Sequence, residues 1–258
     1  MRRQIVEEPE CLSAVWSLRL GVFALAVGAI AIGVTRFQLV EVPAGLAVFG
    51  SAILIACIAL LLAATAAVVI WRTGRRGGVK ALGGALLAAA WLAWPGWLAT
   101  QAMRLPVLND VTTDVADPPQ FSMSRKATEA RGDKMPPAPS ALMRQQQRIA
   151  YPGVQAILLE VEADEAYQLV LKAVQARGWK IIDQSGPGGR SGLGHVDAVD
   201  RTLIMGFPDD ITIRIKPLAG QTKIDVRSAS RYGRNDFGVN ARRVEQFAQE
   251  MQNQLDAR

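Results

Sequence analysis

Cysteine and histidine are nearly absent from the sequence. Two cysteines, Cys11 and Cys57, and one histidine, His195, occur in 258 residues. The chain beyond Cys57 therefore cannot form an internal disulfide, a CxxC redox centre or a thiolate zinc site. A metal site built from several histidines is excluded for the same reason. We accordingly expect no metal and no other cofactor.

The last 155 residues also lack any long apolar run, whereas the first 103 contain three. These runs hold 16, 30 and 23 residues without a charge: Leu20–Thr35, Val42–Trp71 and Ala81–Met103. A helix needs about 20 apolar residues to cross a bilayer, and Arg19 can extend its side chain from the first run to the interface. We therefore predict a membrane domain over residues 1–103. Its three transmembrane helices are expected at about 16–35, 44–71 and 81–101.

Charge is absent from the interiors of the second and third runs, which argues against a transporter or a proton relay. Small residues occur in all three runs and predict close packing between helices. The glycines concerned are Gly28, Gly33, Gly45, Gly83 and Gly84.

The loop between the second and third predicted helices is basic. It holds four basic residues and no acidic one: Arg72, Arg75, Arg76 and Lys80. Cytoplasmic loops carry an excess of lysine and arginine, so this loop and the N-terminus are predicted to be cytoplasmic. Three spans then place the rest of the chain on the opposite side. The expected location is a bacterial inner membrane, with a periplasmic C-terminal domain.

The net charge of +6 lies mostly in the apolar part of the chain. Residues 1–103 hold eight of the 29 Lys/Arg and four of the 23 Asp/Glu, so residues 104–258 hold 21 and 19. A nucleic-acid-binding domain would concentrate basic residues in its soluble part. Nucleic acid is therefore not an expected partner.

Seven prolines punctuate residues 104–153. Proline disfavours helix at the residue before it, so we predict an extended approach segment. Within this segment, the stretch Asp110–Phe121 mixes acidic, hydroxyl and apolar residues and is expected to lie against a folded surface. A short helix is expected near Ser140–Arg148.

The sequence pattern of residues 154–258 predicts a compact α+β domain. Apolar residues at helical spacing over Ala163–Arg177, and again from about Phe237 to the C-terminus, predict two helices. Strands are predicted near Ile157–Val161, Trp179–Ile182, His195–Asp200, Ile211–Ile215 and Ile224–Val226. The order β-α-β-β-β-β-α predicts an antiparallel sheet covered by two helices.

The last two predicted strands specify their own register. Ile211, Ile213 and Ile215 alternate with polar residues, and Ile224 and Val226 do the same. Placing Arg214 opposite Asp225 puts both apolar sets on one face and opposite charges on the other.

The densest polar run links the last strand to the last helix and is the candidate site. With acidic residues nearby it comprises Arg214, Asp209, Asp210, Asp225, Arg227, Ser230, Arg231, Asp236, Asn240 and Arg243. One interpretation is an anion or lipid-headgroup site, because guanidinium groups near a helix N-terminus attract anions. The interpretation we favour is a structural charge network in which the aspartates pair with the arginines and Asp236 is the N-cap. His195 as a general base, and Asp209 with Asp210 as an acid–base or metal pair, are weaker alternatives.

The same run resembles a bacterial, often membrane-attached family known as domain of unknown function 1499. The resemblance rests on Gly206–Arg214 and Asp225–Arg231, followed by Gly233, Asp236, Phe237, Gly238, Asn240 and Arg243. Asp110–Phe121 and Tyr151–Pro152 resemble the upstream motifs of the family. It covers about residues 105–255. It implies membership of that family and carries no activity and no catalytic residue.

These observations together predict a membrane protein that binds rather than catalyses. The lipid bilayer is one expected partner, and an envelope protein or an anionic lipid headgroup is another. The alternative is an envelope hydrolase or lipid-modifying enzyme that uses an Asp/Arg site. A catalytic carboxylate would have to lie in an open cleft. Whether Asp209 and Arg231 converge in such a cleft therefore distinguishes the binding protein from the enzyme.

Overall fold

The computed structural model describes residues 8–132, 134–188 and 192–256. It divides into two compact units. One unit comprises Met1–Gln101 with Ile204–Gly206, and the other comprises Ala102–Leu203 with Phe207–Arg258. The second unit thus includes the Pro-rich segment together with the α+β part of the chain.

Three helices form the first unit: α1 (Leu12–Arg36), α2 (Val42–Thr73) and α3 (Gly78–Arg104). Each is long and apolar enough to cross a membrane, as the sequence predicts. Glycine permits their close approach at three positions. A Cβ atom built at Gly28, Gly45 or Gly84 would lie about 2 Å from a side chain of a neighbouring helix. Gly33 has no such neighbour within 4 Å.

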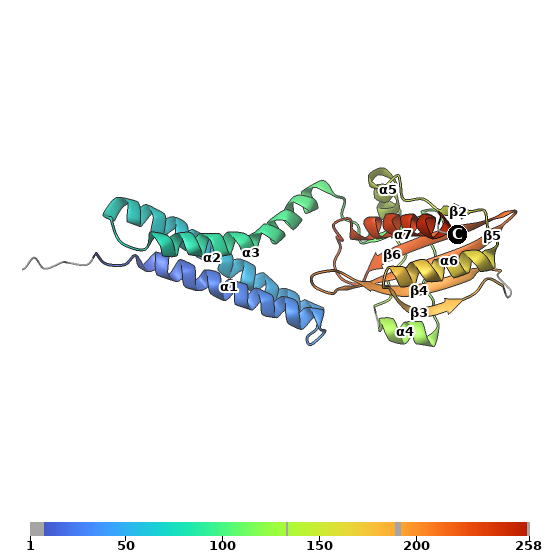
Figure 1. Ribbon diagram of the computed structural model, residues 1–258, viewed down its shortest axis with the longest axis horizontal. Coiled ribbons are helices and arrows are strands. Elements are labelled where there is room, and N and C mark those ends of the chain that lie inside the picture. Colours follow the sequence, from blue (N-terminus) through green and yellow to red (C-terminus); the bar gives the residue numbers. More distant parts are fainter. Residues whose placement is uncertain (1–7, 133, 189–191, 257–258) are drawn as a thin grey trace, which may run out of the picture. The chain divides into compact units, whose positions relative to one another are not determined.

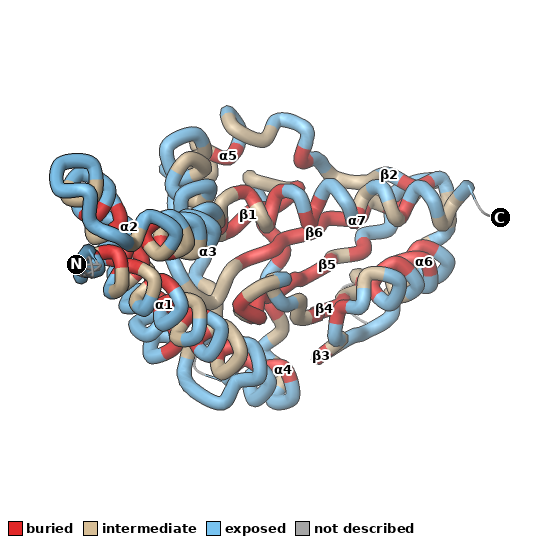
Figure 2. The backbone as a smooth tube through the Cα atoms, turned by 60° about the vertical axis from the view of Figure 1, so that its left-hand side comes forward, coloured by how far each residue is buried: buried red, intermediate tan, exposed pale blue. Residues whose placement is uncertain are grey.

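Six antiparallel strands form one sheet in the second unit. The strands are β1 (Asp110–Thr112), β2 (Ile157–Leu159), β3 (Lys180–Ser185), β4 (Gly194–Arg201), β5 (Pro208–Leu218) and β6 (Gln221–Ser230). Their order is β1-β6-β5-β4-β3, and β2 also pairs with β6. Arg214 lies opposite Asp225, which confirms the predicted register. The central strands β5 and β6 are buried along most of their length (Figure 2).

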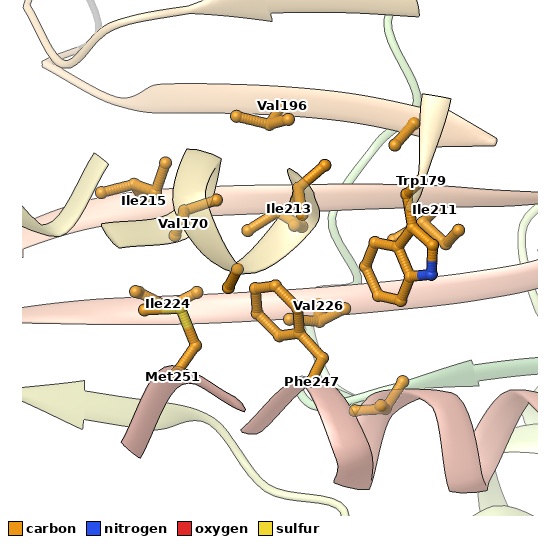
Figure 3. Close-up of a cluster of buried hydrophobic side chains, with 14 of the residues drawn as sticks. Val170, Trp179, Val196, Ile211, Ile213, Ile215, Ile224, Val226, Phe247 and Met251 are labelled. Atoms are coloured by element: carbon orange, nitrogen blue, oxygen red, sulfur yellow. The ribbon is translucent and has the colours of Figure 1, made fainter. Parts of the chain in front are cut away.

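Two helices, α6 (Ala163–Ala176) and α7 (Val239–Asp256), lie side by side against one face of this sheet (Figure 1). Their apolar stripes and the alternate residues of the strands form the main hydrophobic core. Trp179 and Phe247 stack within it at 5.4 Å, close to Val226 (Figure 3). The order β2-α6-β3-β4-β5-β6-α7 is the predicted one.

The Pro-rich segment is more ordered than its composition suggests. It contains β1 and two helices, α4 (Arg125–Arg131) and α5 (Ala141–Ala150), instead of an extended approach. The helix expected near Ser140–Arg148 is α5. Ser124 and Ser140 are the N-caps, and each side chain accepts a hydrogen bond from a backbone N–H in the first turn. The prolines lie between these elements and therefore do not interrupt them.

This segment covers the sheet face opposite α6 and α7. Buried polar residues on that face reach its backbone: Thr212 Oγ1 donates to the carbonyl of Gln120, and Asp197 accepts from the N–H of Ser122. The segment also extends the sheet, because β1 pairs with β6. At the outer edge of β1, the buried side-chain amide of Gln147 bonds both the N–H and the carbonyl of Thr112.

Candidate functional site

The N-terminus of α7 carries the first part of the candidate site. The two carboxylate oxygens of Asp236 accept hydrogen bonds from the backbone N–H groups of Gly238 and Asn240, at 2.8 and 2.9 Å. Asp236 therefore bonds N–H groups at the start of α7 as predicted, although the helix begins at Val239 and the N-cap position itself is Gly238. The amide of Asn240 reaches the last strand, accepting from Ser228 Oγ and donating to Ser230 Oγ. These contacts fix the start of α7 against β6.

Arg243, one turn further along α7, joins this cap to β4 and β5. Its Nη2 donates to Asp209 at 2.7 Å and its Nε donates to Asp200 at 2.8 Å. Arg243 is 4% exposed and Asp209 is 2% exposed, so the pair is out of contact with solvent. Burial, aided by the negative charge of Asp236, raises the pKa of Asp209, and Arg243 opposes that rise. Asp209 is held by one arginine.

Arg131 of α4 is the centre of a second charge network on the opposite face of the sheet. Its side chain is fully buried, and it donates to Asp197 and, at 3.1 Å, to Asp210. Asp210 also accepts two hydrogen bonds from Arg231, at 2.7 and 2.8 Å. Two arginines and two aspartates thus balance one another beneath α4.

His195 lies at the margin of this second network. Its Nε2 is 2.8 Å from Asp197 Oδ1 and its side chain is a quarter exposed. Burial acts to raise the pKa of Asp197, yet His195, Arg131 and Thr212 together hold that pKa below its ordinary value. Ser122 bonds Asp183 through its hydroxyl. In a Ser–His catalytic pair the serine hydroxyl donates to the histidine. Ser122 donates to Asp183 instead, so it does not form such a pair with His195.

Arg227 and Asp110 form a third buried contact, between β6 and β1. Three hydrogen bonds of 2.7 to 3.2 Å join the two side chains, and the remaining guanidinium donors reach the carbonyls of Pro119 and Pro137. Arg227 also lies 4.7 Å from the ring centroid of Phe121. All three guanidinium nitrogens of Arg227 thus donate hydrogen bonds within the domain.

The Arg214–Asp225 pair forms as the register requires, with Nη2 and Oδ2 at 2.9 Å. Arg214 also bonds Asp117, and Lys223 bonds Asp114 at 2.8 Å. The Asp110–Phe121 stretch therefore lies on the folded surface, as predicted, and these ion pairs hold it there.

A pocket of about 250 Å³ opens beside the second network. Its lining comes from α4, β3, β4, β5 and the segment after β6: Ala130, Gly178, Lys180, Ile182, Val199, Asp200, Arg201, Pro208 and Arg231. Three of these side chains are cationic and one is anionic. The anionic one, Asp200, already accepts a hydrogen bond from Arg243. Cationic side chains therefore outnumber anionic ones in the lining, and one of the cations, Arg231, is already paired with Asp210.

The ten predicted residues do not meet in one place. Asp209, Ser230, Asp236, Asn240 and Arg243 lie on the helix-covered face. The other five lie on the opposite face, in three separate pairings: Asp210 with Arg231, Arg214 with Asp225, and Arg227 with Asp110. Asp209 and Arg231 do not converge in an open cleft.

Sequence reasoning missed Arg131, Asp110 and Asp197 as members of these networks. Arg131 lies 66 and 79 residues from its two aspartates, and Asp110 lies 117 residues from Arg227. One signal in the sequence was available. Ser124 accepts a hydrogen bond from the N–H three residues later, and such a serine marks the start of a helix, here the short helix that ends at Arg131. Lys180 and Arg201 of the pocket were missed as well, since they lie outside the dense arginine run.

A comparison with known families identifies the family of the chain. A family model described as "Protein of unknown function (DUF1499)" matches residues 110–251, more than half of the chain. A comparison with curated proteins finds no match. The matched stretch begins at the first residue of β1 and ends within α7, so it includes the Pro-rich segment with the sheet. The chain therefore belongs to the DUF1499 family.

Proposed function

We propose that this protein is a membrane-anchored binding protein without catalytic activity. Three helices would hold the α+β domain at the periplasmic face of a bacterial inner membrane. The domain would bind an anionic envelope component, such as a lipid headgroup, in the pocket lined by Lys180, Arg201 and Arg231. The observation that supports this proposal is the convergence of these three cations, from different elements, on one open pocket.

The state of the aspartates favours binding over hydrolysis. An envelope hydrolase or lipid-modifying enzyme would need a carboxylate open to its substrate. Asp209 is buried against Arg243, and Asp210 is buried between Arg131 and Arg231. A carboxylate that is bound by guanidinium groups and shielded from solvent is poorly placed to take a proton from a substrate.

The orientation in the membrane is proposed from the distribution of basic residues. The α2–α3 loop region is rich in them, and cytoplasmic loops are enriched in lysine and arginine. With three spans, the α+β domain would then lie on the other side of the membrane.

Reporter fusions test this orientation. Alkaline phosphatase, which is active only outside the cytoplasm, should be active when fused to the C-terminus and inactive when fused at Gly77. A cytoplasmic reporter at the same two positions should give the opposite pattern. Phosphatase activity at Gly77 and none at the C-terminus would show that the domain is cytoplasmic.

Inorganic phosphate tests the pocket. The full chain in neutral detergent should bind phosphate saturably, and at ten times Kd its domain should gain roughly 1.4 kcal/mol of stability. The double variant Lys180→Gln/Arg201→Gln should lose both effects. Lys172→Gln, an exposed lysine on α6 away from the pocket, is the matched control and should retain them.

A short-chain phosphatidylglycerol should compete with phosphate if a headgroup is the natural ligand. Equal binding of phosphate by the double variant and the wild-type chain would rule out this pocket as the anion site.

A further inference from the structure

Helix α5 turns a polar residue toward the domain and exposes two large apolar residues, with the exposed Gln145 between them. Its one buried residue is Gln147, whose amide bonds the backbone of Thr112. Leu142 and Ile149 lie seven residues apart, and therefore on one face of the helix, and they are 63% and 76% exposed. A surface helix normally buries its apolar stripe, so the outward side of α5 has the character of a contact surface.

The charge of this helix has one sign. Residues 141–150 include Arg144 and Arg148 and no acidic residue. Arg148 is exposed and lies next to Ile149, so the apolar face is bordered by positive charge. Beyond its C-terminal end, burial and the negative charges of Asp236 and Glu245 raise the pKa of Tyr151, and the positive charge of Arg242 opposes that rise. A short helix with an outward apolar stripe and only basic charges fits the headgroup region of an anionic bilayer.

The end of α5 lies beside the point where the chain leaves its last apolar helix. Tyr151, which follows α5, and Leu105, which follows α3, flank the same glycine. A Cβ atom at Gly238 would lie 3.3 Å from Tyr151 Oη and 3.3 Å from Leu105 Cδ1. Only five residues separate Arg104 from β1, a reach of roughly 17 Å when fully extended. The chain therefore enters the domain from α3 close to the C-terminal end of α5.

We propose that the outward face of α5 binds the surface of the bilayer in which the protein is anchored, with Leu142 and Ile149 in the interface and Arg144 and Arg148 at anionic headgroups. The contact would fix the orientation of the domain relative to the membrane. It uses different residues from the phosphate pocket and does not depend on it, because α5 contributes nothing to that pocket.

An environment-sensitive fluorophore on the full chain tests this contact. Cys11 and Cys57 are replaced by serine and alanine, Ile149→Cys is introduced, and the labelled protein is reconstituted into vesicles of phosphatidylcholine with phosphatidylglycerol. The label should show blue-shifted emission and should be quenched by brominated lipid chains. Leu218→Cys is the matched control. It is an exposed apolar residue at the end of β5, opposite Gln221. It therefore lies about 30 Å along the ten-residue β6 from Ser230 and should remain in water.

Two further comparisons make the result decisive. Arg144→Gln/Arg148→Gln should lower the ratio of lipid-bound to free label roughly 25-fold, because each basic residue near an anionic surface contributes about a five-fold factor. Dilution of the protein in lipid should leave the signal at position 149 unchanged. A signal that fades on dilution would identify a second copy as the occupant, and a water-like spectrum at position 149 would equally overturn the proposal.

Discussion

Replacing Arg131 with alanine should lower the free energy of unfolding of the α+β domain by roughly 3–5 kcal/mol. The substitution leaves two carboxylates, Asp197 and Asp210, buried without the guanidinium group that joins them. Asp210 keeps Arg231, but Asp197 keeps no guanidinium partner and retains His195, Thr212 and a backbone N–H. Because a domain of this size is stable by roughly 5–15 kcal/mol, the loss is a large fraction of the total.

Pulse proteolysis of the detergent-solubilised full chain across a urea series measures this loss, since it detects cleavage within the domain. Arg125→Ala is the matched control. Arg125 lies on the same short helix, its side chain is 92% exposed, and its ion pair with Glu129 is at the surface. Its unfolding curve should match that of the wild-type protein. Coincident curves for Arg131→Ala and Arg125→Ala would mean that the buried pairs contribute little to stability.

Replacing Gly84 with alanine should separate α3 from α1. The new Cβ atom would lie 2.2 Å from Ser17 Oγ and 2.6 Å from the backbone carbon of Ser17. Backbone atoms cannot rotate aside, so one helix must move, at a cost of roughly 1–3 kcal/mol or more. The displacement would also disturb the hydrogen bond from Ser17 Oγ to the carbonyl of Ala59 in α2.

Gly83→Ala is the matched control for this second substitution. It makes the same chemical change one residue earlier in the same helix, so any gain in helix propensity is shared. Its Cβ atom would meet only the flexible end of Leu18, at 3.3 Å. Unfolding in mixed micelles with increasing SDS should therefore occur earlier for Gly84→Ala than for Gly83→Ala. Identical transitions would show that the helices are not in close contact at this glycine.

Local sequence patterns were sufficient to predict most of the fold. The alternation over Ile211–Ile215 and Ile224–Val226 specifies which face is buried, and so the Arg214–Asp225 register follows from the sequence. The helices α6 and α7 follow from their apolar spacing. The lengths of the three apolar runs predict the three helices that are long and apolar enough to cross a membrane.

Local sequence patterns could not predict which aspartate each arginine binds. An arginine next to several aspartates in sequence has many sterically feasible partners, and the choice depends on which segments the fold brings together. Arg227 bonds Asp110, which is remote in sequence, and none of the nearer candidates. The role of residues 104–153 was underestimated for a related reason. Its short elements are stabilised by contacts with the sheet and give only weak periodic signals of their own.

The pairing of β1 with β6 also has a consequence for biosynthesis. Asp110 and Arg227 are 117 residues apart, so the sheet cannot be completed until the ribosome has added nearly the whole domain. At roughly 5–20 residues per second, β6 is synthesised some 6–24 s after β1. The three apolar helices precede both strands in the chain and are complete before that interval begins. All three apolar helices are therefore synthesised while the domain still lacks the strand that completes its sheet.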